Sequence, residues 1–269
     1  MASLAAPTPL PPDIRLMNAT AALLGAIGVA ALLAAALAWA VHRPVFAVRA
    51  IRIDGDLAHN SVATIRANAA RKLQGNFFTM DLGATRRAFE SVPWVRQALV
   101  RRVWPNRLAV RLEEHRPVAL WGGDPGNDEP IDKLVNDQGE VFEANLGDVE
   151  DDALPTLRGP EGTAAHMLAM LGRLSVEFAP LDEHVDALDL SGRGSWRAEL
   201  DSGAAVEIGR GSDDEVVART RTFVATLPEL RARYQDHPLL YADLRHRDGY
   251  AVRLGGVSTA VDSGKTQKK

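Results

Sequence analysis

Residues 95–112 read VRQALVRRVWPNRLAVRL, and the fold of the surrounding region follows from them. From residue 108 to residue 113, large apolar side chains alternate with small or charged ones, which indicates a half-buried β-strand. Val95–Val103 predicts the strand before it, and residues 104–107 (WPNR) predict the turn between the two. This stretch therefore predicts a β-hairpin.

A strand and two helices are expected before this hairpin. Residues 46–54 alternate imperfectly and end in an Asp-Gly turn signal, which predicts a strand. Asn60-Ser61 can cap a helix, and Asp81 can cap a second, shorter helix that stops before Pro93. The order strand, helix, helix, strand, strand predicts a three-stranded sheet with one face buried under two helices.

After Pro117 the pattern becomes mostly β, with two helices. Ser212-x-x-Glu215 is a capping box that opens the second helix, which is expected to end near Leu227. Short apolar runs bounded by turn residues predict the strands. We expect a hairpin at 134–142, helices at 163–178 and 212–227, and strands at 185–190, 196–200, 204–208, 239–244 and 250–254.

An uncharged apolar run lies near the N-terminus. From Leu16 to Val41 there is no Asp, Glu, Lys, Arg or His, and the run exceeds the ~20 apolar residues with which a helix crosses a bilayer core. We expect a transmembrane helix at 17–41, with Trp39 near an interface, after a Pro-rich tail at 1–16. A cleaved signal peptide, with its cleavage site near residues 36–38, and a buried soluble helix remain alternatives.

The charge of the chain changes sign near Pro117. The 269 residues carry a net charge of −4. Residues 42–116 have 14 Lys and Arg against 6 Asp and Glu, whereas residues 117–269 have 16 against 28. This reversal indicates a domain boundary, so we expect one domain at 46–116 and a second at 117–254. The small, polar residues 255–269 are expected to be a disordered tail.

No sequence pattern points to a catalytic or metal site. The lack of cysteine excludes disulfides, thiol nucleophiles and Cys-based zinc sites. The seven histidines show no His-x-x-x-His spacing, and there is no Gly-x-Ser-x-Gly nucleophile elbow. The basic region 42–116 has no nucleic-acid reader motif, and beside a membrane helix it favours anionic headgroups or an acidic partner. These features favour a binding protein over an enzyme.

Several motifs together resemble one family. They are FAVRAIRIDG at 46–55, NFFTMD at 76–81, PWV at 93–95, RVWP at 102–105, EHRPVALW at 114–121, LP at 154–155, SW at 195–196, IGR at 208–210 and YADLR at 241–245. At this spacing they resemble the FtsQ/DivIB family of bacterial cell-division proteins, which carry a POTRA domain and a β domain. The resemblance covers about residues 16–254, nearly the whole chain.

The resemblance implies an α+β fold: a single transmembrane helix, a POTRA domain of order β-α-α-β-β, and a mainly antiparallel β domain with two helices. It implies a single-pass inner-membrane protein with a cytoplasmic N-terminus and its bulk in the periplasm, at the division septum. The implied function is a non-catalytic divisome scaffold, without cofactor, small-molecule substrate or nucleic acid. The alternative is a membrane-anchored periplasmic POTRA adaptor of a secretion or outer-membrane assembly system.

The resemblance also implies the partners FtsB and FtsL, held by the last strands of the β domain, and other divisome proteins, contacted through the POTRA domain and the transmembrane helix. FtsB is expected to add a strand to an open sheet edge formed by residues 241–254. The partner-binding residues carried over by position are Arg193, Tyr241, Arg245, His246, Asp248, Gly249, Tyr250 and Leu254.

The two arginines of this set, Arg193 and Arg245, match positions that face partner carboxylates in the family. His246 stands where the family often has Tyr, and Leu254 where it can have Trp, so the side-chain contacts at these two positions are open. Arg245 as a solvated surface charge and Tyr241 as a core aromatic also remain alternatives.

Overall fold

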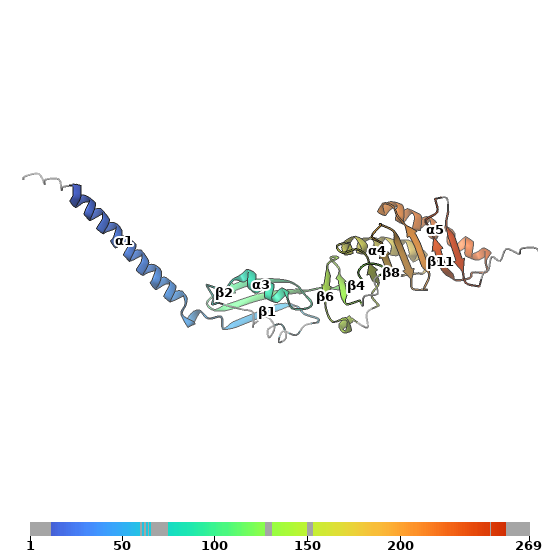
Figure 1. The fold of residues 1–269 in the computed structure, drawn as a ribbon. Helices are drawn as coiled ribbons and strands as arrows, with labels where there is room; N and C mark the ends of the chain where they lie inside the picture. Colours follow the sequence, from blue (N-terminus) through green and yellow to red (C-terminus); the bar gives the residue numbers. More distant parts are fainter. Residues whose placement is uncertain are drawn as a thin grey trace, which may run out of the picture. The chain divides into compact units, whose positions relative to one another are not determined.

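The computed structural model describes residues 12–59, 61, 63, 65, 75–126, 131–149, 153–247 and 249–256. The chain divides into two compact units, Met1–Glu113 and Glu114–Lys269. Figure 1 shows the elements of each along the chain, and we describe each unit by itself.

The N-terminal helix α1 runs from Pro12 to Val41. It is long and apolar enough to cross a membrane, and no residue of its most apolar window is buried against the rest of the protein. The helix includes residues 12–16, which we had expected in the tail. Proline suits the first position of a helix because the missing N–H has no partner there, and Asp13 in the first turn favours the positive end of the helix dipole. The unburied apolar surface indicates a single-pass membrane anchor.

The first unit contains a short 3-10 helix, three strands and a helix. Their bounds are η1 Pro44–Phe46, β1 Ala50–Asp56, α3 Leu82–Glu90, β2 Val95–Val103 and β3 Arg107–Glu114. The sheet order is β1-β3-β2, with β1 parallel to β3. The hairpin predicted at 95–112 is confirmed. The first strand begins at Ala50 rather than at residue 46, because Pro44–Phe46 turn as a 3-10 helix.

The first of the two predicted POTRA helices lies mostly outside the described residues, where only Ser61, Ala63 and Ile65 are described. The second is α3, and Asp81 caps it as predicted: its carboxylate accepts hydrogen bonds from the Gly83 and Ala84 amides. Apolar side chains of residue 65, of α3 and the turn after it, and of one face of the sheet form the core of this unit: Ile65, Phe89, Val92, Val95, Ala98, Val110 and Leu112. One sheet face is therefore buried and the other is open.

The second unit contains nine strands, two α-helices and two short 3-10 helices among its described residues. The first half comprises β4 Pro117–Trp121, β5 Lys133–Asn136, β6 Val141–Glu143, η2 Leu146–Val149, β7 Thr156–Arg158, α4 Ala164–Phe178 and η3 Ala179–Leu181. The second half comprises β8 Val185–Leu190, β9 Trp196–Leu200, β10 Ala205–Gly209, α5 Asp213–Arg233, β11 Leu239–Asp243 and β12 Ala251–Leu254.

All nine strands form one sheet, ordered β12-β11-β10-β9-β8-β7-β4-β5-β6. Five of the eight pairings are antiparallel, and β10–β11, β4–β7 and β7–β8 are parallel. We did not expect β4 and β7 as strands. β7 has three residues, too few for an alternation signal, and it is defined by its pairing with β4 and β8 instead.

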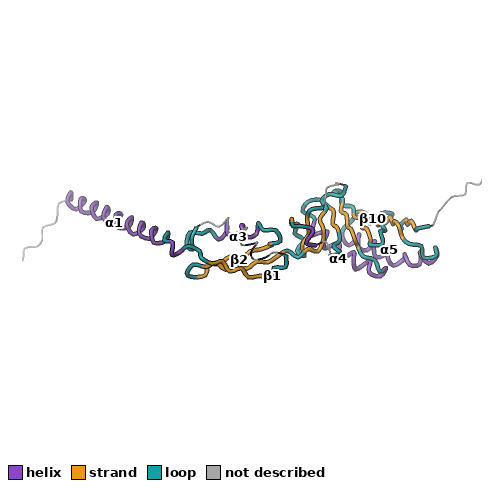
Figure 2. Tube along the Cα trace, turned by 90° about the horizontal axis from the view of Figure 1, so that it is seen from below, coloured by secondary structure: helices purple, strands orange, loops and turns teal. Residues whose placement is uncertain are grey.

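Helices α4 and α5 lie on the same side of this sheet, as Figure 2 shows. The fully buried side chains between helices and sheet include Phe178, Trp196 and Phe223. The predicted capping box at Ser212 and Glu215 is present, but α5 continues past Leu227 to Arg233. Pro228 removes one backbone donor without ending the helix, and Leu230 beyond it still packs against the core.

Candidate functional site

Strand β12 is the terminal strand of the nine-stranded sheet. It pairs on one side with β11, in antiparallel register that places Tyr241 opposite Arg253 and Asp243 opposite Ala251. Within the part of the chain that the structure describes, its other side is an edge of the sheet. A strand edge presents backbone donors and acceptors to which another strand can add.

The register determines which backbone groups of β12 face outward. The Leu244 amide donates to the Glu207 carbonyl at 2.8 Å, so Leu244 turns its backbone groups toward β10. Successive residues of a strand face opposite neighbours, so Tyr241 and Asp243 turn theirs toward β12. The residues opposite them, Arg253 and Ala251, turn their backbone N–H and C=O groups toward β11. Val252 lies between these two, and its N–H and C=O therefore point to the open edge.

One face of the β12 segment holds the strand on the core. Leu254 is buried, and Tyr250 and Val252 are half-buried against the core. The Tyr250 ring packs edge-on against Phe223 of α5 with centroids 5.0 Å apart, and its hydroxyl lies 2.7 Å from Thr226 Oγ1. The side chains of Tyr250 and Leu254 thus secure the edge strand rather than project from it.

The other face carries Tyr241 and Arg253. Tyr241 is half-buried, and the Arg253 guanidinium lies 5.6 Å from the centre of its ring. Tyr241 is opposite Arg253, and Val252, which points to the core, is opposite Ala242. Tyr241 therefore lies on the face away from the helices. Its ring and the Arg253 side chain form an accessible strip beside the open edge.

Arg245 follows β11 and binds Asp243. Its Nε donates to Asp243 Oδ1 at 2.9 Å and its Nη2 donates to Oδ2 at 2.6 Å. The Asp243 side chain is 15% exposed and that of Arg245 is 54% exposed. These side-chain hydrogen bonds lower the pKa of Asp243 to about 2. The Arg245 guanidinium, which is expected to face a partner carboxylate, thus binds a carboxylate of its own chain. Its Nη1 is the nitrogen that does not take part in the pair with Asp243.

Gly209, the last residue of β10, makes room for Arg245. Its φ is +90°, and a Cβ there would lie 2.7 Å from Arg245 Cγ. A side chain at residue 209 would be strained by the backbone and would displace Arg245. The glycine therefore allows the Arg245 side chain to pass close to the end of β10.

The remaining residues of the expected set share one end of the sheet. His246 and Gly249 are exposed in the β11–β12 connection, and Asp248 lies outside the described residues. Arg193 is exposed in the β8–β9 turn, which is at the same end because Trp196 of β9 pairs with Gly209. β9 is two strands from β11, roughly 10 Å at ~4.8 Å per strand, so Arg193 is near the edge without belonging to it.

Residues that the sequence reasoning missed are Asp243, Val252, Gly209 and the α5 pair Phe223 and Thr226. The Asp243-x-Arg245 spacing places both side chains on one face of an extended segment, which is a signal for their ion pair. The outward position of Val252 depends on the contact of Leu244 with Glu207, for which the local sequence holds no signal.

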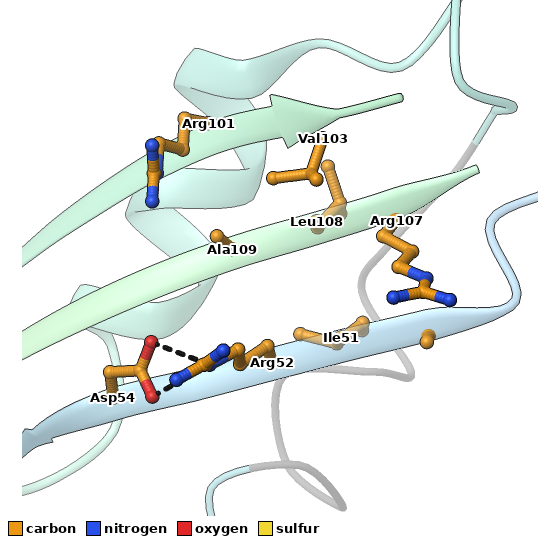
Figure 3. A pocket seen from close by; sticks show the side chains of 9 residues that line it. Ile51, Arg52, Asp54, Arg101, Val103, Arg107, Leu108 and Ala109 are labelled. Carbon is orange, nitrogen blue, oxygen red and sulfur yellow. Dashed lines mark hydrogen bonds and ion pairs between the residues drawn. The ribbon is translucent and has the colours of Figure 1, made fainter. Parts of the chain in front are cut away.

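A second candidate surface lies on the open sheet face of the first unit. A depression of about 460 Å³ is lined by β1, β2 and β3, with the side chains shown in Figure 3. Arg52 pairs with Asp54 at 3.0 Å, and Arg101 and Arg107 also line it. Its basic character fits the positive charge of residues 42–116, but it contains no convergent acid, base or nucleophile.

The geometry agrees with comparisons to known proteins. Residues 46–115 match the family model described as POTRA domain, FtsQ-type, and residues 119–245 match that of cell division protein FtsQ/DivIB, C-terminal. The cell division protein FtsQ of Burkholderia pseudomallei is 41% identical over 257 residues, covering 95% of this chain and 99% of that protein.

The chain belongs to the FtsQ/DivIB family.

Other FtsQ proteins are similar over comparable lengths. That of Thiomonas arsenitoxydans is 40% identical over 94% of this chain and 91% of its own, and that of Bordetella pertussis is 39% identical over 90% and 92%. The FtsQ/DivIB resemblance and the α+β fold are therefore confirmed. This family consists of non-catalytic division proteins, so the chain is a division protein rather than an enzyme, and membership implies a role and partners in the divisome. The alternative secretion or outer-membrane adaptor has no support in these matches.

Proposed function

We propose that this chain is a divisome scaffold that holds FtsB, and with it FtsL, by strand addition at β12. The observation that carries the proposal is the position of β12 as the last strand of the sheet, with Val252 turned to the open edge. An added strand would hydrogen-bond to the backbone of Val252, which tolerates sequence change in both chains.

The charge around the edge supports an acidic partner segment. Residues 245–253 carry three arginines and one aspartate, in a domain that is acidic overall. Arg253 is exposed beside Tyr241, and Arg245 is about half exposed beside its pair with Asp243. A partner carboxylate could meet Arg253 directly and Nη1 of Arg245 without breaking the Asp243 pair, and Arg193 would act at longer range.

The proposal includes the placement of the parts of the chain. Residues 1–16 form the cytoplasmic end, α1 spans the inner membrane over 17–41, and the POTRA domain (46–116) and the β domain (117–254) lie in the periplasm at the septum, before a tail at 255–269. Support comes from the apolar surface of α1 and from family membership.

The test compares prolines at the two edges of the sheet. Val252→Pro removes the outward N–H of β12. Val141 lies on β6, the opposite edge, and its N–H also points outward, because the Asn136 amide donates to Glu140 O and pairs alternate along the hairpin. Proline is tolerated where an edge N–H faces solvent, so both variants should fold.

Full-length variants are then compared for recovery of FtsB and FtsL from membranes. We expect Val252→Pro to lose FtsB and FtsL, and Val141→Pro to recover them like the unmodified chain. Equal recovery by both variants, with equal thermal unfolding, would contradict strand addition at β12.

A further inference from the structure

Three aromatic side chains gather in the first unit just after α1, and strand addition gives them no role. Phe46 and Phe78 lie edge-to-face with ring centroids 4.9 Å apart, and Trp104 lies 6.4 Å from Phe46. Two of them also pack against the ring of the buried Phe77, whose centroid is 5.3 Å from that of Phe78 and 5.8 Å from that of Trp104. We call Phe46, Phe78 and Trp104 the aromatic patch.

The aromatic patch is open to its surroundings. The exposed fraction is 68% for Trp104 and 46% for Phe78, and the neighbouring Val45 is 64% exposed. Exposed apolar side chains that occur singly need no explanation, but a contiguous group of large ones marks an interaction surface. The aromatic patch therefore indicates a surface that contacts an apolar or interfacial environment.

Hydrogen bonds tie the patch to the end of α1. Asn76 Nδ2 donates to the carbonyl of Val41, the last residue of the helix, at 2.7 Å, and the Phe77 amide donates to the Phe46 carbonyl at 2.8 Å. Arg102 Nη2 donates to Met80 O at 2.6 Å and so fixes the loop that carries Phe78. Phe46 is five residues beyond Val41, at most ~18 Å along an extended chain.

The end of α1 belongs at the membrane interface if the helix crosses a bilayer. Its 30 residues span ~45 Å at ~1.5 Å each, more than the ~30 Å hydrocarbon core. Trp39, close to its end, has the Arg43 guanidinium 3.6 Å from its ring centre. Tryptophan is enriched in the headgroup layer, where an apolar ring and a polar N–H are both satisfied. The loop that carries Phe78 is thus hydrogen-bonded to a helix end whose residues are typical of the headgroup layer.

Basic side chains accompany the patch. Arg43 and Arg49 are exposed on the segment that connects α1 to β1, and the Arg49 amide donates to Asn106 O, next to the Trp104 turn, at 3.0 Å. Arg107 follows that turn and is also exposed. Anionic lipid headgroups attract clustered basic side chains that lie near a bilayer surface.

We propose that the aromatic patch inserts into the headgroup layer of the membrane that α1 crosses, and that the nearby arginines bind lipid phosphates. The first unit is then held to the bilayer by a second contact besides its covalent link to α1. The NFF and RVWP motifs supply this contact. The inference rests on the proposed membrane anchoring but not on strand addition at β12.

Spin labels on single cysteines test the insertion, because the chain has no native cysteine. The full chain is reconstituted into phosphatidylcholine vesicles with labels introduced by Phe78→Cys or Trp104→Cys. Collisions with oxygen, which partitions into lipid, are compared with collisions with a water-soluble nickel chelate. The control is Val176→Cys, on α4 of the second unit, where the native side chain is 71% exposed. We expect the oxygen-to-nickel ratio to be severalfold higher at 78 and 104 than at 176.

The other outcomes are separable. Ratios at 78 and 104 equal to that at 176 would overturn the proposal, and shielding from both reagents would overturn it in favour of a protein contact. A label at Leu24→Cys, within α1, reports anchoring separately: a lipid signal there with water signals at 78 and 104 defeats this inference alone. A water signal at residue 24 defeats the anchoring on which it rests.

A second measurement, of energy transfer to lipids, compares a protein with the native aromatic patch with one in which the patch is changed. A donor dye on Leu99→Cys, an exposed position of β2, transfers energy to acceptor lipids in the vesicle. We expect Phe78→Ser with Trp104→Ser to lower this transfer, and Val176→Ser to leave it unchanged. Phosphatidylglycerol in the vesicles should raise the transfer of the unmodified chain. Unchanged transfer in the double variant would contradict insertion, and no response to phosphatidylglycerol would contradict the role of the arginines.

Discussion

The two edges of the nine-stranded sheet have the same backbone chemistry and opposite surroundings. Residues 137–143, around β6, carry three carboxylates and no Lys or Arg, whereas residues 245–253, around β12, carry three arginines and one aspartate. β6 is a three-residue strand, and the Phe142 ring stacks on His115 at 4.1 Å. Both edges have outward N–H groups. In the proposed docking, the charge of the side chains and the accessible strip of Tyr241 and Arg253 distinguish the β12 edge from the β6 edge.

The largest effect should come from the side chains that secure each edge strand. Leu254→Ala should lower the free energy of unfolding by about 2–5 kcal/mol, because it leaves a cavity under β12. Phe142→Ala should cost about 3–5 kcal/mol at the other edge. Denaturant unfolding of the full chain in detergent measures both. Only Leu254→Ala should also release FtsB, and loss of FtsB by both variants to the same extent would remove the distinction between the edges.

A smaller effect is expected at the Asp243–Arg245 pair. Asp243→Asn should lower stability at neutral pH by about 1 kcal/mol, less than a fully buried hydrogen bond to a charged group, because solvent screens the half-exposed Arg245 guanidinium. Because the pKa of Asp243 is lowered to about 2 from 3.8, its contribution is full above pH ~4 and is lost as the pH falls through about 2.

The check is the pH dependence of denaturant unfolding. The stability difference between the unmodified chain and Asp243→Asn should be constant from neutral pH to about pH 4 and should shrink toward about pH 2. A difference that did not change over this acidic range would show that the Arg245 pair does not stabilise the ionised carboxylate.

Charge reversal beside the edges should change the association rate. Arg253→Glu should weaken FtsB binding by about 0.5–1 kcal/mol, mainly through slower association, and should reduce its dependence on salt. Glu143→Lys, in β6, should leave the affinity and its salt dependence unchanged. The association rate of FtsB with the surface-immobilised full chain is measured at a series of salt concentrations. A rate independent of salt in the unmodified chain would contradict electrostatic recognition at β12.

The smallest effect is expected for Arg193. It lies two strands from β11, so Arg193→Ala should weaken FtsB binding by less than about 0.5 kcal/mol. The same binding assay measures it, beside Arg253→Ala. If Arg193→Ala had the larger effect of the two, the partner would have to extend across the end of the sheet instead of following β12.

The sequence predicted those elements whose turns and caps form between neighbouring residues. The hairpin at 95–112, the Asp81 cap of α3 and the capping box of α5 all follow from neighbouring residues. Elements that depend on distant partners were missed. The three-residue β7 exists because two strands flank it, and α5 passes Pro228 because Leu230 packs on the core.

The same division holds for the candidate site. The resemblance identified the segment 241–254, and the structure describes it as β11, a connection and the edge strand β12. The orientation of each side chain could not follow from the motif. Tyr250 points to Phe223 and Thr226, and Arg245 binds Asp243, because register and packing set these contacts.

Amide exchange at Val252 tests strand addition at β12 most directly. In the full chain without FtsB, residue-resolved NMR should find the Ala251 and Arg253 amides protected by β11 and the Val252 amide exchanging freely. Saturation with FtsB should protect Val252 and leave Val141 of β6 unchanged. A Val252 amide that still exchanges freely in the saturated complex would contradict strand addition at this edge.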